Sequence, residues 1–183
     1  PRIHQAIADD SLKDNPELQA FITKLKTTGG AAHLMGLFSD GGVHAHHAHT
    51  AALANILAAH NIKTIIHAFT DGRDTLPKVA LAQYDRFAAN LSAPVQWGTV
   101  IGRYFAMDRD NRHERTKQAF DAITSAKADY SAANYQEAVE AAYARDERDE
   151  FIAATVIEGY QGLQSGDGIF MMNFRVDRAR QIL

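Results

Sequence analysis

The chain has 183 residues, of which 46% are hydrophobic, with a formal net charge of −3 and a pI near 6.3. This length allows a substantial core but not two domains of usual size, so we expect a single domain spanning residues 1–183. The slightly acidic balance argues against binding to nucleic acid or to an anionic membrane. Without Cys, disulfides and thiolate metal sites are excluded. No apolar stretch reaches signal-peptide or membrane-spanning length, so we expect a cytoplasmic protein.

The first predicted elements are a capped helix and a strand-helix unit. Asn15, Pro16 and Glu17 are typical of an N-cap, first helical position and first-turn acid, and Gly29-Gly30 is typical of the stop. Residues 33–38 form a short apolar run bounded by Asp-Gly-Gly, which predicts a buried strand. Residues 48–60, rich in Ala and Leu, predict the helix that follows it.

A second unit of the same kind follows. Residues 63–69, rich in Ile, predict a strand, and Pro77 is placed to open a helix that runs to about Leu91. Residues 95–101 predict a third strand, followed by a polar helix from about Asn111.

The last part of the chain predicts one more helix and one more strand. Residues 134–144 predict an amphipathic helix and 168–174 a fourth strand, whereas 149–158 give no clear assignment. A further helix is predicted from about Arg175. Strands separated by helices predict an α/β fold, a three-layer α/β/α sandwich with a mainly parallel sheet. Because the chain starts without Met and stops within a predicted helix, we expect a piece of a longer protein.

Each of the four predicted strands stops at a cluster of charged residues and Gly. Loops that follow parallel strands converge on one edge of the sheet, where ligands of such sheets usually bind. That edge would carry five arginines. The clusters are residues 39–44, 71–74, 102–110 and 173–178.

Taken singly, an exposed Arg beside an Asp is usually a solvated ion pair worth at most about 1 kcal/mol. Solvated ion pairs are a weaker explanation when all five arginines lie at one edge of the sheet. The pairs Arg103/Arg109 and Arg175/Arg178 are spaced so that two guanidinium groups can approach one ligand, and Arg suits forked hydrogen bonds to carboxylate or phosphate. The residues alone therefore support a site for a small, doubly anionic ligand, with Asp74 or His44 available for proton transfer.

Four histidines lie close together in the sequence, and imidazoles at such spacing can bind zinc or a similar ion. They are His44, His46, His47 and His49. No carboxylate or thiolate motif completes a site, and four His within six residues cannot all face one point. We therefore assign no metal ligand and favour His44, which directly follows a Gly-Gly turn, for substrate contact. His67 lies in an apolar strand and is expected to be a core residue, and the remaining histidines are expected at the surface.

The motifs at the strand ends closely resemble those of the cofactor-independent (2,3-bisphosphoglycerate-independent) phosphoglycerate mutases. They occur in the family's order, and the similarity extends from Arg2 to Gln181. The matching segments are 34–46 (Leu-Met-Gly-Leu-Phe-Ser-Asp-Gly-Gly-Val-His-Ala-His), 67–75 (His-Ala-Phe-Thr-Asp-Gly-Arg-Asp-Thr), 102–110 (Gly-Arg-Tyr-Phe-Ala-Met-Asp-Arg-Asp) and 173–181 (Asn-Phe-Arg-Val-Asp-Arg-Ala-Arg-Gln).

The resemblance implies an isomerase that interconverts 3-phosphoglycerate and 2-phosphoglycerate in glycolysis and gluconeogenesis through a phosphoserine intermediate. Members of that family have a phosphatase domain and an inserted phosphotransferase domain, and this chain is similar to the inserted domain alone. The serine nucleophile and two divalent metal ions, usually Mn, belong to the phosphatase domain. We therefore expect no cofactor in this chain, no 2,3-bisphosphoglycerate requirement, a monomer, and no activity without the phosphatase domain of the same polypeptide.

The resemblance also assigns substrate-binding positions, which largely coincide with the residues selected from the strand ends. Asp74 is implied as the acid or base for the glycerate hydroxyls, with Arg73 and Arg103 near the carboxylate and hydroxyl end and Arg109, Arg175 and Arg178 near the phosphate. The implied substrate-binding residues are His44, Arg73, Asp74, Arg103, Arg109, Arg175 and Arg178.

Two other hypotheses remain open at this point. The first, suggested by the histidine run, is a self-sufficient metal-dependent phosphoesterase, which tight stoichiometric metal binding would support. Alternatively, the chain is a stable fold or binding module with weak affinity for phosphoglycerate.

Overall fold

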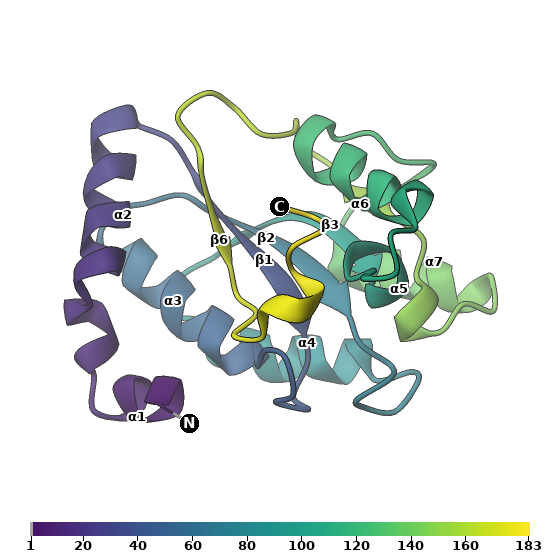
Figure 1. Ribbon diagram of the computed structural model, residues 1–183, viewed down its shortest axis with the longest axis horizontal. Coiled ribbons are helices and arrows are strands. Elements are labelled where there is room, and N and C mark those ends of the chain that lie inside the picture. The colour runs from purple at the N-terminus through teal and green to yellow at the C-terminus, as the bar shows by residue number, and fades with distance from the viewer. Residues whose placement is uncertain (1) are drawn as a thin grey trace.

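A mainly parallel sheet forms the middle layer of the protein, whose structure is a computed structural model that describes residues 2–183 (Figure 1). Within these residues the sheet has six strands in the order β4-β5-β3-β2-β1-β6, and only β5 pairs antiparallel, with β3. The strands are β1 (Ala32–Phe38), β2 (Thr64–Thr70), β3 (Gln96–Gly102), β4 (Tyr130–Ala132), β5 (Thr155–Ile157) and β6 (Gly168–Met171).

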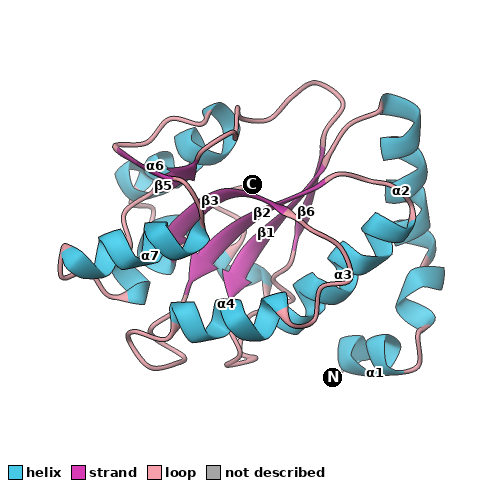
Figure 2. Cartoon of the chain, turned by 180° about the vertical axis from the view of Figure 1, so that it is seen from behind, coloured by secondary structure: helices cyan, strands magenta, loops and turns pink. Residues whose placement is uncertain are grey.

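Helices cover both faces of the sheet, which confirms the predicted three-layer α/β/α arrangement. α3, α4 and α7 pack on one face, in front of the sheet in Figure 2, while α5, α6 and the C-terminal segment pack on the other. α2 packs beside α3. Between Arg2 and Leu183 the helices are α1 (Arg2–Ala8), α2 (Pro16–Thr28), α3 (His47–Ala59), α4 (Ala80–Ala88), α5 (Arg103–Ala106), α6 (His113–Ser125) and α7 (Tyr135–Ala144), with 3-10 turns η1 (Ser11–Asp14), η2 (Asp149–Phe151) and η3 (Val176–Arg178).

The central strands are buried along their whole length. Every residue of β1 and β2 is buried, as expected for parallel strands covered on both faces. The large side chains of the core include Phe38, Phe69, Phe87 and Tyr135, each at most 2% exposed. Among residues 2–183, no helix is both long enough and apolar enough to cross a bilayer.

Local sequence signals placed most helix starts correctly. The Asn15 side chain accepts hydrogen bonds from the backbone amides of Glu17 (3.0 Å) and Leu18 (3.1 Å), and Gly29 ends the helix in the left-handed conformation, as predicted. Asn134 caps α7 in the same way through the amide of Glu137.

Two predicted helices differ from the structure. The helix expected from Pro77 begins at Ala80, because Asp149 accepts hydrogen bonds from the amides of Val79 (2.8 Å) and Ala80 (3.1 Å) and so caps the helix there. The helix expected from Arg175 is only the three-residue turn η3. Val176 in this turn is 59% exposed, and nothing in the structure explains why the helix is so short.

Other elements carried no clear sequence signal. No pattern in the sequence predicted α1, α5, β4 or β5, and β6 ends at Met171 rather than at residue 174. After β6 the Asn173 side chain accepts a hydrogen bond from the amide of Leu37 at 2.9 Å. The amide of Phe174 donates a hydrogen bond to the carbonyl of His44 at 2.9 Å. These bonds hold the following loop against the end of β1.

At the end of β3, the backbone at Gly102 packs closely against a neighbouring segment. The amide of Gly102 donates a hydrogen bond to the carbonyl of Ile152 at 2.7 Å. A Cβ added at Gly102 would collide with the backbone of Glu150 and lie 2.6 Å from the amide nitrogen of Ile152. We expect Gly102→Ala to lower the free energy of unfolding by about 3 kcal/mol in urea denaturation. At Gly29 no atom lies within 4 Å of an added Cβ, so Gly29→Ala should cost only its backbone strain, about 1 kcal/mol. Equal losses for the two variants would contradict the close packing.

Candidate active site

The loops that follow β1, β2, β3 and β6 meet at the carboxyl edge of the sheet. Because β1 pairs in parallel with both β2 and β6, and β2 pairs in parallel with β3, the four strands end side by side. This places all the predicted site residues in one region. His44 follows β1, Arg73 and Asp74 follow β2, Arg103 and Arg109 follow β3, and Arg175 and Arg178 follow β6.

Arg103 lies at the bottom of this region as a buried cation. Its Nη1 atom is 2.6 Å from Asp74 Oδ2 and 2.7 Å from Asp71 Oδ1, and the residue is only 3% exposed. Burial alone lowers the pKa of a guanidinium, but the bonds to Asp74 and Asp71 outweigh it and raise the pKa of Arg103. Arg103 is therefore a fixed positive charge shared by two carboxylates.

His44 lies between two carboxylates. Its Nε2 atom is 4.0 Å from Asp74 Oδ2, and its Nδ1 atom is 3.9 Å from Asp177 Oδ1. Burial lowers the pKa of His44, and the positive charges of Arg103 and Arg175 lower it further, against the effect of Asp177 and Asp74. His44 is therefore a neutral imidazole near pH 7. Its Nδ1 atom and Asp177 Oδ1 are buried and have no hydrogen-bond partner among the described residues.

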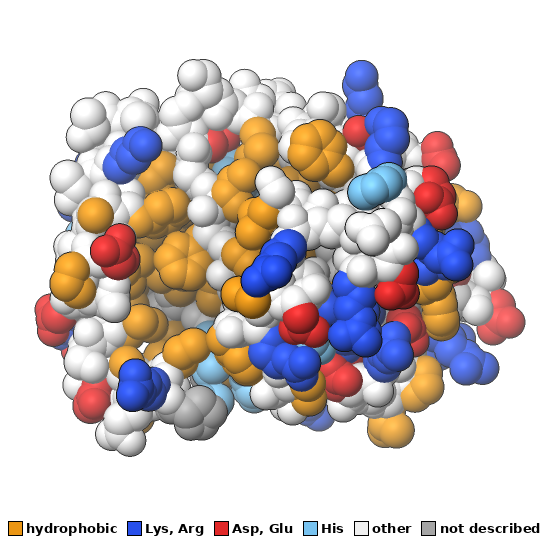
Figure 3. All heavy atoms as spheres, in the orientation of Figure 1, with side chains coloured by type: hydrophobic (Ala, Val, Ile, Leu, Met, Phe, Trp, Pro, Cys, Tyr) orange, Lys and Arg blue, Asp and Glu red, His pale blue; other side chains and the backbone are white. Residues whose placement is uncertain are grey.

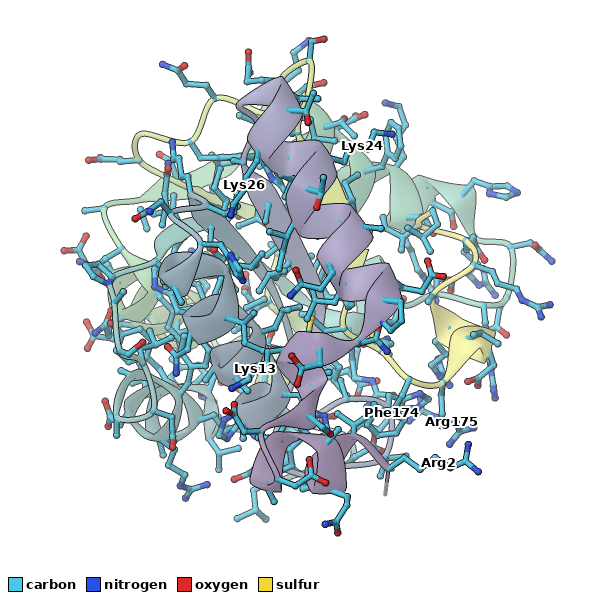
Figure 4. The ribbon with its side chains drawn as sticks, turned by 90° about the vertical axis from the view of Figure 1, so that its left-hand side faces the viewer. Arg2, Lys13, Lys24, Lys26, Phe174 and Arg175 are labelled. Carbon is cyan, nitrogen blue, oxygen red and sulfur yellow. The ribbon has the colours of Figure 1, made fainter. Side chains whose placement is uncertain are left out.

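Asp177 pairs with two arginines, Arg109 and Arg175, on the outer side of the region. Arg109 Nη1 lies 3.4 Å from its Oδ2 atom, and Arg175 Nε lies 3.4 Å from its Oδ1 atom. Burial opposes ionisation of this carboxyl, but Arg175 and His44 outweigh it and hold the pKa of Asp177 below its ordinary value. In Figure 4, Arg175 extends from the segment that begins at Phe174, on the side of the molecule where Arg2 also lies. Arg175 is thus at the outer margin of the cluster.

The two remaining arginines complete the cluster. Arg73 Nη1 lies 3.6 Å from Glu150 Oε1, with its side chain 56% exposed, and Arg178 donates to the carbonyl of Met107 at 3.3 Å. Burial lowers the pKa of Arg178, and so do the nearby charges of Arg109, Arg103 and Arg73. Arg178 therefore lies within electrostatic range of Arg109, Arg103 and Arg73.

Positive charge gathers visibly on this face of the molecule. Figure 3 shows basic side chains close together with acidic ones interspersed, near η3 and α5. Four of the five arginines pair with carboxylates, and Arg178 bonds to a carbonyl instead, so these five arginines outnumber their four carboxylate partners by one. The carboxylates hold the arginines in place, and exposed guanidinium N–H groups remain for an anion.

The histidine run does not converge on one point. His44 faces Asp74 and Asp177, whereas His47 lies against Phe38 and His49 bonds to His4 at 3.2 Å. In the part of the chain that the structure describes, no group of three or more His, Asp or Glu side chains is arranged to hold a metal ion.

The expectation that the other histidines lie at the surface is wrong for three of them. His33, His47 and His49 are 0%, 3% and 4% exposed. His33 is held by Asp167 at 3.0 Å and by His67 at 2.9 Å, so charged and polar partners from distant strands make its burial tolerable. His67, expected in the core, is indeed buried and bonded at both ring nitrogens.

Sequence reasoning missed three carboxylates that organise the arginines. Asp71 and Asp177 lie within the charged clusters, but nothing in the sequence distinguished them from turn residues. Glu150, which pairs with Arg73, comes from a segment without a clear sequence signal. Only the fold shows which carboxylate meets which arginine.

The sequence of the chain matches a known protein family and proteins from several bacteria. The family described as "BPG-independent PGAM N-terminus" matches residues 3–183. A protein from Ruegeria sp. (strain TM1040), named 2,3-bisphosphoglycerate-independent phosphoglycerate mutase, is 54% identical over 182 residues, which cover 100% of this chain and 36% of that protein. A protein of the same name from Rhodopseudomonas palustris is 50% identical over 183 residues, again 100% of this chain and 36% of that protein.

A solved structure supports the fold. The phosphoglycerate mutase of Leishmania mexicana, in crystals at low cobalt concentration, superposes with a TM-score of 0.88 at 22% identity, over 98% of this chain and 36% of that one. The chain thus spans about a third of the length of the relatives it matches. Since the family match covers nearly every residue, the chain belongs to the BPG-independent PGAM N-terminus family.

Proposed function

We propose that this chain is the substrate-binding phosphotransferase domain, residues 1–183, of a 2,3-bisphosphoglycerate-independent phosphoglycerate mutase. It binds 3-phosphoglycerate and 2-phosphoglycerate, and the isomerisation requires the phosphatase domain of the same polypeptide. The observation that supports this most directly is the meeting of five arginines, His44 and Asp74 at one sheet edge. The names of the relatives indicate the reaction and its independence of 2,3-bisphosphoglycerate.

The proposed roles follow from position and charge. Arg103 and Arg73 bind the carboxylate and hydroxyl end of the substrate, while Arg109, Arg175 and Arg178 bind the phosphate. Asp74 is 21% exposed at its side chain and exchanges a proton with a glycerate hydroxyl, next to the neutral His44. Glycerate must stay bound between two phosphoryl transfers, and several arginines around its carboxylate slow its departure.

The phosphoryl group itself is carried elsewhere in this proposal. A serine of the phosphatase domain takes it from the substrate and returns it to the other hydroxyl. Two Mn ions bound to that domain would stabilise the negative charge of the phosphoryl group during its transfer. The arginines supply electrostatic stabilisation from this side. The chain alone should therefore show neither mutase nor phosphatase turnover, and turnover by the purified chain would contradict this division of roles. We expect a monomeric protein of the cytoplasm.

Calorimetry with 3-phosphoglycerate tests the binding site. We expect weak binding by the chain, since contacts from the phosphatase domain are missing. Arg73→Ala and Arg175→Ala should each weaken binding about tenfold or more, because a hydrogen bond to a charged group contributes about 1.5 to 3 kcal/mol. Both side chains are at least half exposed, so their removal should leave the fold intact.

The control is Arg145→Ala. Arg145 pairs with Glu147 and stacks on Tyr130, neither of which is a proposed binding residue, so its loss should leave binding unchanged. Unaltered binding in both Arg73→Ala and Arg175→Ala would overturn the assignment. If the wild-type chain gave no heat of binding with 3-phosphoglycerate, the chain would be a stable fold without a preformed binding site.

A further inference from the structure

One buried carboxylate takes no part in the proposed binding contacts, although it contacts three of the four loops that form the site. Asp71 follows β2 directly and is 0% exposed. We propose that Asp71 is a positioning residue: it holds Arg103 and the turn that carries Arg73 and Asp74, and it balances the charge of Arg103 so that Asp74 is free to exchange a proton. The role of Asp74 in this inference rests on the proposed function.

The contacts of Asp71 join three of the four loops. Its Oδ1 atom accepts from Arg103 Nη1 at 2.7 Å and from the amides of Arg73 at 3.1 Å and Asp74 at 3.0 Å. Its Oδ2 atom accepts from Ser39 Oγ at 2.6 Å, and Ser39 Oγ in turn accepts from the amide of Gly41 at 3.0 Å. One carboxylate therefore fixes the ends of β1, β2 and β3 relative to one another.

The second part of the argument concerns charge. Arg103 Nη1 bonds to both Asp71 and Asp74, but the two carboxylates differ in access: Asp71 is fully buried, and the side chain of Asp74 is 21% exposed. Burial would raise the pKa of Asp71, but the bonds from Ser39, the Asp74 amide and Arg103 outweigh it and lower that pKa. Asp71 therefore stays ionised and neutralises Arg103 whether Asp74 carries a proton or not.

A simple structural role would have a different consequence. If Asp71 only shaped the turn, Asp71→Asn would keep an oxygen for the amides of Arg73 and Asp74 and leave the titration of Asp74 unchanged. If Asp71 balances Arg103, the same variant leaves the cation facing Asp74 alone. The other titratable groups near this pair are His44, 4.0 Å from Asp74, Arg178, whose pKa the charge of Arg103 lowers, and Asp149 of η2, whose pKa the charge of Asp71 helps to raise.

The test is a carbon-detected NMR titration of the Asp74 carboxyl in the 183-residue chain without ligand. In Asp71→Asn we expect the midpoint to move to lower pH by about one unit or more, since an opposite charge favours the ionised form. The double variant Asp71→Asn/Arg103→Gln removes both charges and should reverse that movement. Asp177→Asn, which removes a carboxylate that does not touch Arg103, is the matched control and should move the midpoint much less.

A measurement on the wild-type chain keeps the inference testable if Asp71→Asn does not fold. The side-chain nitrogen signals of Arg103 should show slow rotation of the guanidinium, whereas those of the exposed Arg109 should show fast rotation. An unchanged or raised Asp74 midpoint in Asp71→Asn, or rotation of Arg103 as fast as that of Arg109, would overturn the inference. Neither measurement needs substrate, so a failure to bind 3-phosphoglycerate would count against the proposed function alone.

Discussion

Replacing Arg103 with Met should lower the free energy of unfolding by about 3 to 5 kcal/mol, because the change leaves Asp71 as an unpaired charge in the interior. Arg103 is 3% exposed and Asp71 is 0% exposed, so water does not replace the lost partner. Met keeps most of the side-chain volume, which limits the effect of a cavity. Urea denaturation followed by circular dichroism measures the loss.

The matched control is the same substitution at Arg109. Its side chain is 50% exposed and pairs with Asp177 at 3.4 Å, so its contribution to stability should be less than about 1 kcal/mol. Both arginines belong to the proposed substrate site, and both variants should bind 3-phosphoglycerate more weakly. A stability loss of similar size in the two variants would show that Arg103 is not the buried partner described above.

His67→Gln should remove part of the acid sensitivity of the fold. His67 is 1% exposed, and burial, followed by the charge of His33, lowers its pKa to about 3. The unfolded chain binds a proton at this residue below about pH 6.5, whereas the folded chain does not until about pH 3. Stability from this residue is therefore fully present above pH 6.5 and is lost as the pH falls. Between pH 7 and pH 5 the loss is about 2 kcal/mol.

The geometry around His67 gives the neutral ring a defined proton position. His33 Nε2 donates to Asp167 Oδ2 at 3.0 Å, so His33 Nδ1 accepts from His67 Nε2 at 2.9 Å, and His67 Nδ1 accepts from Thr99 Oγ1 at 3.0 Å. A second proton on His67, at Nδ1, would require the Thr99 hydroxyl to turn from donor to acceptor and would place a positive charge in the buried interior.

Urea denaturation at pH 7 and pH 5 checks this expectation. The stability difference between the two pH values should be about 2 kcal/mol smaller in His67→Gln than in the wild-type chain. His113→Gln, at an exposed position at the start of α6, should retain the wild-type difference. The same pH dependence in His67→Gln and in the wild type would show that His67 is not kept neutral by the fold.

Much of the fold was predictable because its signals are local. The apolar runs of β1, β2 and β3 lie within one or two residues of their predicted bounds, and the Asn15 and Asn134 caps mark helix starts through bonds to residues two or three positions away. The alternation of strands and helices was enough to predict a parallel sheet, and hence the edge at which the charged loops meet. The start of α4 was not predictable, because Asp149, which caps it, lies 70 residues after Val79.

For the site, residue order alone was enough to predict that five arginines, His44 and Asp74 follow the strands, and the motifs indicated the family. Their partners became visible only in the folded chain: Arg103 pairs with Asp71 and Asp74, Arg73 pairs with Glu150, and Asp177 pairs with Arg109 and Arg175. Charges interact through distance and burial, and both quantities are set by loops that lie tens of residues apart in the chain and meet only when the sheet has formed.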